Sequence, residues 1–162
     1  MANNARGVID INLSALMDPP SPYSGPVQIG SRIIKQLANG TTSGKIRNAL
    51  TVAVALAASG TQTIDLSALT NILGESVSGG KLVAVLIETG PSNAATFKIE
   101  GGASNPFTWF GGVVTTYPAN YVGLDYSGSS SEWVIDGTHK TLKVTNLSGS
   151  VSLAVNITFF LT

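Results

Sequence analysis

Short runs of apolar and β-branched residues, separated by Gly, Ser and Asn, make up the chain from Lys45 to Thr162. Such runs between turn-forming clusters are typical of β-strands, and no long amphipathic helix is expected among them. Their spacing fits a β-sandwich or a β-barrel. We predict an all-β fold, an antiparallel, jelly-roll-like β-sandwich with an extended N-terminal arm. Strands are expected near residues 47–57, 61–66, 82–88, 94–100, 106–110, 119–125, 132–136, 140–145 and 151–161, and a short helical turn at 67–74.

Four local patterns make this prediction more specific. Leu82–Ile87 is continuously apolar, which is typical of a central strand covered on both faces. Apolar residues occupy every second position from Val151 to Phe159, so they are expected to share one buried face. Asp136-Gly137 separates two apolar runs and favours the type I′ turn of a β-hairpin. Asp65 is expected to cap or hydrogen-bond the turn that follows it.

Residues 1–44 differ from the rest of the chain and are expected to form a separate arm, with the sandwich in residues 45–162. Val8–Leu13 alternates apolar and polar residues as a half-buried strand does. Four prolines within residues 19–26 favour an extended, polyproline-like path. Ser31–Leu37 fits either a strand or a helical turn.

Two interpretations of this segment are open: a disordered tail, or an arm that folds against a neighbouring subunit. Its many apolar residues favour the arm, because segments that stay disordered in solvent have few apolar residues. The residues expected at the interface of the arm are Val8, Ile9, Ile11, Leu13, Leu16, Pro19, Pro20, Tyr23, Ile29, Ile33 and Ile34.

The scarcity of charge and the absence of cysteine exclude several partners. Charged residues make up 11% of the chain, its formal net charge is +0, and it contains no cysteine. Nucleic acids and anionic membranes are bound through basic patches, and no run of Lys or Arg occurs, so neither partner is expected. Disulfides and thiolate metal sites are impossible without cysteine.

The sequence offers no centre for catalysis. Its one histidine, His139, follows the predicted hairpin turn and is expected in solvent rather than in a pocket. The acidic residues show no spacing typical of a metal-binding loop, although carboxylates from separate loops remain an alternative for calcium. No phosphate-binding loop or nucleophile elbow is present. We therefore expect no enzymatic activity, no catalytic residue, no metal and no cofactor.

Aromatic residues cluster between residues 107 and 133. Three roles are open for them: filling the core, forming a subunit interface, or providing a platform on which a glycan stacks. The candidates for the two surface roles are Phe107, Trp109, Phe110, Tyr117 and Tyr121; Tyr126 and Trp133 complete the cluster.

An ordered succession of segments carries a resemblance to a known group of proteins. The segments are the polar hinge 40–44, the run 56–69 (LAASGTQTIDLSAL), the apolar strand 82–87, the run 95–107 (ATFKIEGGASNPF), and the segments 133–135 and 141–146 (TLKVTN). In this order they resemble small virion proteins of tailed bacteriophages, over roughly residues 40–162. The proline-containing arm and Val113–Tyr126 depart from the pattern.

The resemblance implies a β-sandwich that decorates or cements a phage capsid, often as a trimer, and it carries no catalytic residues. The expected partners are the major capsid protein and further copies of the chain in a homotrimer, and the expected location is the capsid exterior of the virion. The alternative is a β-module of a fibre or tail that binds host surface glycan or another virion protein.

Overall fold

The computed structural model describes residues 7–17, 27–38, 45–71, 74–76, 80–107, 114–126 and 133–162. Over these residues the fold is all-β, with a single turn of 3-10 helix, η1 (Leu66–Ala68). Among the described residues, no helix is long and apolar enough to cross a membrane. The strands are β1 (Gly7–Met17), β2 (Val27–Leu37), β3 (Asn48–Leu56), β4 (Thr61–Asp65), β5 (Lys81–Thr89), β6 (Phe97–Gly101), β7 (Thr115–Tyr117), β8 (Val122–Tyr126), β9 (Trp133–Val134), β10 (Thr141–Asn146) and β11 (Leu153–Leu161).

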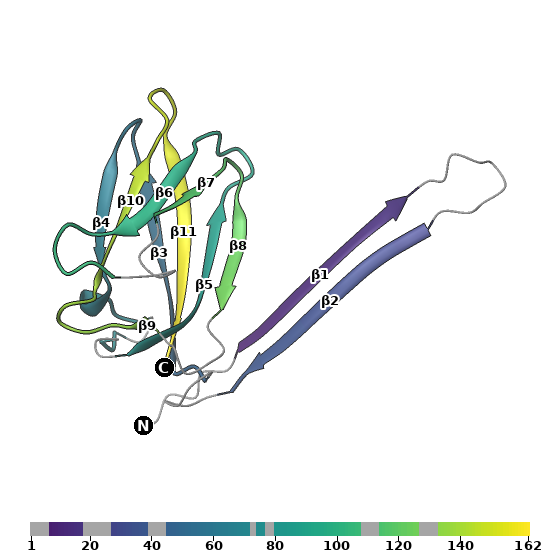
Figure 1. The fold of residues 1–162 in the computed structure, drawn as a ribbon, viewed down its shortest axis with the longest axis horizontal. Coiled ribbons are helices and arrows are strands. Elements are labelled where there is room, and N and C mark those ends of the chain that lie inside the picture. Colours follow the sequence, from purple (N-terminus) through teal and green to yellow (C-terminus); the bar gives the residue numbers. More distant parts are fainter. Residues whose placement is uncertain are drawn as a thin grey trace.

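Two antiparallel sheets pack face to face as a β-sandwich, which confirms the predicted fold class (Figure 1). One sheet, which we call the β11 sheet, has the order β3-β11-β5-β8, and β9 pairs with β5 beside it. The other, the β10 sheet, has the order β4-β10-β6-β7. The strand pairs are nested along the chain: β6 with β7, then β5 with β8, β4 with β10, and β3 with β11.

The core lies between the sheets and is built by alternate residues of their strands. Along β11, Leu153 and every second residue up to Leu161 are buried, whereas the residues between them are exposed or half-buried. Val151, expected on the same buried face, precedes the strand and is exposed. The alternation in the sequence therefore predicts the inward face of β11 except at its beginning.

The central strand β5 is covered on both faces at its beginning, as its apolar sequence predicts. Val83 points away from the main core, yet its exposure is 0%. It forms a second small cluster with Ile46, against which Tyr126 and Phe160 pack. A hydrogen bond from Ile46 N to Ala38 O (2.9 Å) ties this cluster to the residue that follows β2.

The N-terminal segment forms a two-stranded antiparallel ribbon that projects away from the sandwich (Figure 1). β1 and β2 pair over their full lengths, from Gly7 opposite Leu37 to Met17 opposite Val27. The predicted strand at Val8–Leu13 is confirmed, and the segment 31–37 is a strand rather than a helical turn. The predicted polyproline-like path at 19–26 lies outside the described residues.

The predicted hairpin at Asp136-Gly137 is wrong. β9 pairs with β5, whereas β10 pairs with β4 and β6, so the chain crosses here from one sheet to the other. Neither residue of the dipeptide has the positive φ that a type I′ turn needs. Instead, the Asp136 carboxylate accepts hydrogen bonds from the backbone N–H groups of Thr138 and His139. This local Asx-type turn competes with a hairpin for the same residues.

Other strand predictions also differ from the structure: the strands predicted at 94–100 and 119–125 begin later, as β6 and β8. The strand predicted at 106–110 is absent at Pro106 and Phe107, where Pro106 makes only an isolated bridge and Phe107 lies outside any strand. The short strand β7 was not predicted, because three residues are too few to show an alternating pattern.

Changing Ile157 to Ala should destabilise the sandwich by about 2–5 kcal/mol, because the removed atoms leave a cavity in a fully buried site. Asn156→Ala, one residue earlier on the exposed face, is the control and should change stability by less than about 0.5 kcal/mol. Chemical denaturation followed by tryptophan fluorescence measures both. Equal losses of stability would contradict the register of β11.

Candidate interaction surfaces

The register of the ribbon sorts its residues onto two faces. Residues paired directly across two strands lie on the same side, and the sides alternate along each strand. One side, the apolar face of the ribbon, combines Gly7, Ile9, Ile11, Leu13, Ala15 and Met17 with Val27, Ile29, Ser31, Ile33, Lys35 and Leu37. The other, the polar face, combines Val8, Asp10, Asn12, Ser14 and Leu16 with Gln28, Gly30, Arg32, Ile34 and Gln36.

The residues expected at the interface of the arm divide between these faces. Ile9, Ile11, Leu13, Ile29 and Ile33 fall on the apolar face, Val8, Leu16 and Ile34 on the polar face, and Pro19, Pro20 and Tyr23 outside the described residues. Ile34 is 53% exposed. The pairing of β1 with β2 thus concentrates the large aliphatic residues on one side, which the sequence of either strand alone does not reveal.

The outer face of the β11 sheet is poor in charge. Its exposed or half-buried residues are Ala49, Thr51, Ala53 and Ala55 of β3, Ala154, Asn156, Thr158 and Phe160 of β11, Leu86 and Glu88 of β5, and Val122, Leu124 and Tyr126 of β8. Val122 is 65% exposed. Among these residues Glu88 is the charged one, and exposed Lys81 lies at the other end of β5. This face was not predicted, although the alternation of Ala and Thr with apolar residues in β3 signals it.

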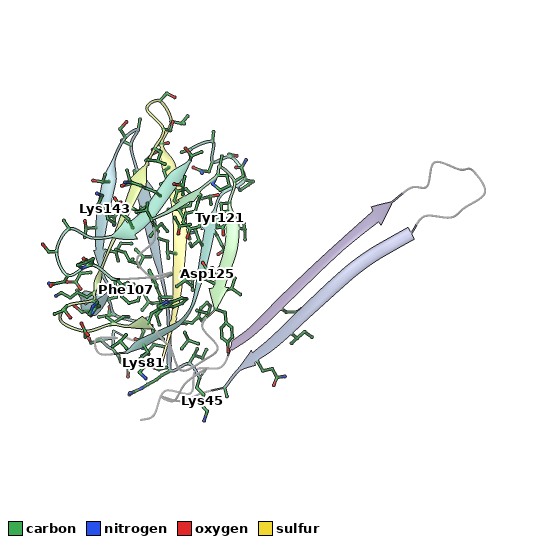
Figure 2. All side chains as sticks on the ribbon, viewed as in Figure 1. Lys45, Lys81, Phe107, Tyr121, Asp125 and Lys143 are labelled. Carbon is green, nitrogen blue, oxygen red and sulfur yellow. The ribbon has the colours of Figure 1, made fainter. Side chains whose placement is uncertain are left out.

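The outer face of the β10 sheet differs, because it carries a paired set of charges. Glu100 on β6 forms ion pairs with Lys98 of the same strand (3.0 Å) and with Lys143 of β10 (2.9 Å). Hydrogen bonds from Lys143 and then Lys98 hold the pKa of Glu100 below its usual value. In Figure 2, Lys143 lies on the left of the sandwich, whereas β8 lies on the right. Such a surface is suited to contact with water.

The aromatic candidates separate into core residues and others. Phe107 and Tyr117 are 2% and 3% exposed and belong to the main core, so their side chains cannot provide a surface for a glycan. Tyr121 is half-buried beside Tyr117, with 4.7 Å between their ring centroids. Trp109 and Phe110 lie outside the described residues. Tyr126 and Trp133 are half-buried.

Asp125 is an acid placed toward the interior. It lies opposite Val85 in the pairing of β8 with β5 and is half-buried on the β8 side of the sandwich, as is Tyr121 (Figure 2). Desolvation raises the pKa of the Asp125 carboxyl. Burial, and then the charge of Asp125, raises the pKa values of Tyr117 and Tyr121. The ionised carboxylate is therefore unfavourable in the folded chain.

The remaining polar candidates have structural partners. Asp65 caps η1 by accepting hydrogen bonds from the backbone N–H (2.9 Å) and hydroxyl (2.6 Å) of Ser67, as predicted. His139 is exposed, and its Nδ1 lies 3.1 Å from an Asp136 oxygen. Hydrogen bonds from Thr138 and His139 hold the pKa of Asp136 well below its usual value. Among the described residues no three metal-ligating side chains gather at one place.

No family model matches the chain, and no curated protein or solved structure matches it either. The function is therefore inferred from the surfaces of the molecule. Two surfaces stand out: the apolar face of the projecting ribbon and the outer face of the β11 sheet.

Asp125→Asn should raise the melting temperature at pH 7. The folded-state pKa of Asp125 is raised, so its contribution to stability is present below the unfolded value near 3.8 and is lost as the pH rises through the folded value. A neutral amide removes that loss. Thermal unfolding at several pH values should show a gain that shrinks as the pH falls toward 3.8. The exposed control Glu88→Gln should show no such gain; a destabilised Asp125→Asn would mean that the carboxylate is favourably paired.

Proposed function

We propose that this chain is a structural virion protein that decorates or cements a bacteriophage capsid. In this role the sandwich sits over capsomer junctions on the capsid exterior, and its ribbon extends onto neighbouring subunits. The major capsid protein and further copies of the chain, as a homotrimer, are the proposed partners. The shell is stabilised because each molecule holds several subunits together.

The projecting ribbon is the observation that carries the proposal. An isolated two-stranded ribbon is at best marginally stable in water, and this one gathers its large aliphatic residues on one face. Such a ribbon gains stability when another surface covers it. A protein that works by assembly provides that surface, whereas a small enzyme has no need of it.

The strand topology of the sandwich also supports the proposal. We interpret the nested strand pairs as a jelly roll, in which a long hairpin is rolled up into two sheets of four strands each, with β9 as an additional strand beside β5. Viral capsid domains and lectins both use this architecture. The low charge of the chain agrees with a part that remains in an assembly and has no contact with the packaged DNA.

The architecture is shared with lectins, so a glycan-binding module of a fibre or tail is the second candidate. It would need surface aromatics, and the burial of Phe107 and Tyr117 removes two of the five expected. Loss of glycan-array binding in Trp109→Ala would favour this candidate. Electron microscopy of virions separates the two directly, because density on the tail rather than at capsomer junctions would refute the cement function.

Deleting residues 1–40 should abolish binding to capsids while the sandwich stays folded. The reason is that the deletion removes the ribbon but retains Ile46, which covers Val83. Co-sedimentation with capsids measures the binding, and circular dichroism with thermal unfolding checks the fold. Undiminished capsid binding by the truncated chain would exclude the ribbon from the mechanism.

A further inference from the structure

We propose that the apolar face of the ribbon docks on the outer face of the β11 sheet of a second copy of this chain. This deepens the proposed function by naming the surfaces through which copies associate, and in that sense it rests on the proposed function. In a closed ring of two or three copies, each copy would dock its own ribbon on a neighbour and bind a neighbour's ribbon on the outer face of its β11 sheet.

The two surfaces complement each other in shape. The apolar face of the ribbon offers large residues such as Ile11 and Ile33, whereas the receiving face offers small ones such as Ala53 and Ala55. Two β-sheets that pack face to face interdigitate when large side chains of one sheet meet small side chains of the other. The strands of the ribbon have eleven residues, and those of β3 and β11 have nine, so the surfaces also match in length.

Two hydroxyl groups of the receiving face are compatible with burial. The hydroxyls of Thr51 and Thr158 hydrogen-bond to each other across β3 and β11 (2.8 Å). Covering them therefore leaves neither without a partner, and unpartnered polar groups are the main cost of burying such a surface.

Charge sets the direction of docking. Lys35 is the charged residue among the positions of the apolar face, close to the root of the ribbon. Glu88 is the acid of the receiving face, and Lys81 lies at the opposite end of the same strand. A ribbon whose root lies at the Glu88 end places Lys35 beside Glu88 and away from Lys81. The opposite direction brings two lysines together.

The buried area is sufficient for a stable contact. Strands of eleven residues are about 37 Å long at ~3.4 Å per residue, and a ribbon of two strands is roughly 10 Å wide. Since the receiving strands have nine residues, one docked ribbon covers roughly 600 Å², counting both surfaces, and two exchanged ribbons cover roughly 1,200 Å². Stable protein interfaces bury about 1,200–2,000 Å² in total.

A second copy is favoured over the chain's own sheet. The root of the ribbon lies next to the cluster of Ile46 and Val83, at one end of the β11 sheet. From there the ribbon points away from its own sandwich (Figure 1). Docked on its own sheet from this root, the ribbon would place Lys35 at the Lys81 end of β5, so the direction that brings Lys35 to Glu88 needs the sheet of a second copy.

Single-cysteine variants test the contact, since the natural chain contains no cysteine. Full-length Ile33→Cys is mixed with isotopically labelled Ala53→Cys and treated with a short bismaleimide. We expect a cross-linked dimer that contains one chain of each kind. Two controls each replace one of these variants. Ile34→Cys, on the polar face of the ribbon, replaces Ile33→Cys, and Thr63→Cys, on the exposed surface of β4, replaces Ala53→Cys. Both controls should give little cross-linked product.

Other cross-linking results would overturn the proposal. A dimer of two Ile33→Cys chains in place of the mixed product means that ribbons pack on each other. If a double variant that carries both Ile33→Cys and Ala53→Cys cross-links only within one chain, the ribbon folds onto its own sheet. Equal products with the control variants mean that the contact is not specific.

Sedimentation of the purified chain, without capsids, provides the second measurement. Ile33→Ser and Ala53→Glu should weaken self-association by at least about tenfold, whereas Ile34→Ser and Thr63→Glu should leave it unchanged. Lys35→Glu should also weaken it, and the added Glu88→Lys should restore it. A natural chain that stays monomeric at every concentration overturns the inference. The capsid-binding test is independent of this one. If the chain binds capsids as a monomer, the contact between copies is refuted but the cement function is not.

Discussion

β11 is the strand on which the rest of the sandwich depends. It pairs with β3 on one side and with β5 on the other, and its inward residues are buried along its whole length. A strand in this position cannot slip, because a shift of one residue would move every buried side chain to the outer face. The register of β11 thereby determines which residues of β3 and β5 face outward.

The two outer faces of the sandwich have different chemistry, and this difference is one basis of the proposed function. The β10 sheet presents Lys98, Glu100 and Lys143 as an ion-paired group, which interacts well with water. The β11 sheet presents mainly Ala, Thr and aliphatic residues. Together with a ribbon that is apolar on one side by register, this supports the proposal that the molecule works by contact with other subunits.

Much of the fold could be predicted from the sequence, because β11, β5 and β3 have long, uninterrupted patterns. The failures occurred where the pattern is short or the turn is local. β7 has three residues, and the Asp136 turn is held by its own side chain rather than by strand pairing. For the candidate surfaces, the sequence pointed to the apolar residues of the arm but did not separate Ile33 from Ile34, because their faces depend on the partner strand.

By itself, the sequence determined the inward face of β11 from Leu153 onward, since burial of alternate apolar residues is a local property of a pleated chain. It also determined the low charge and the absence of any run of Lys or Arg. Only the tertiary structure decided which strands are neighbours, where the ribbon points, and that Ala49, Thr51, Ala53 and Ala55 join residues of β11, β5 and β8 in one surface. Strand pairing between distant segments produces such surfaces, and no local pattern in the sequence specifies it.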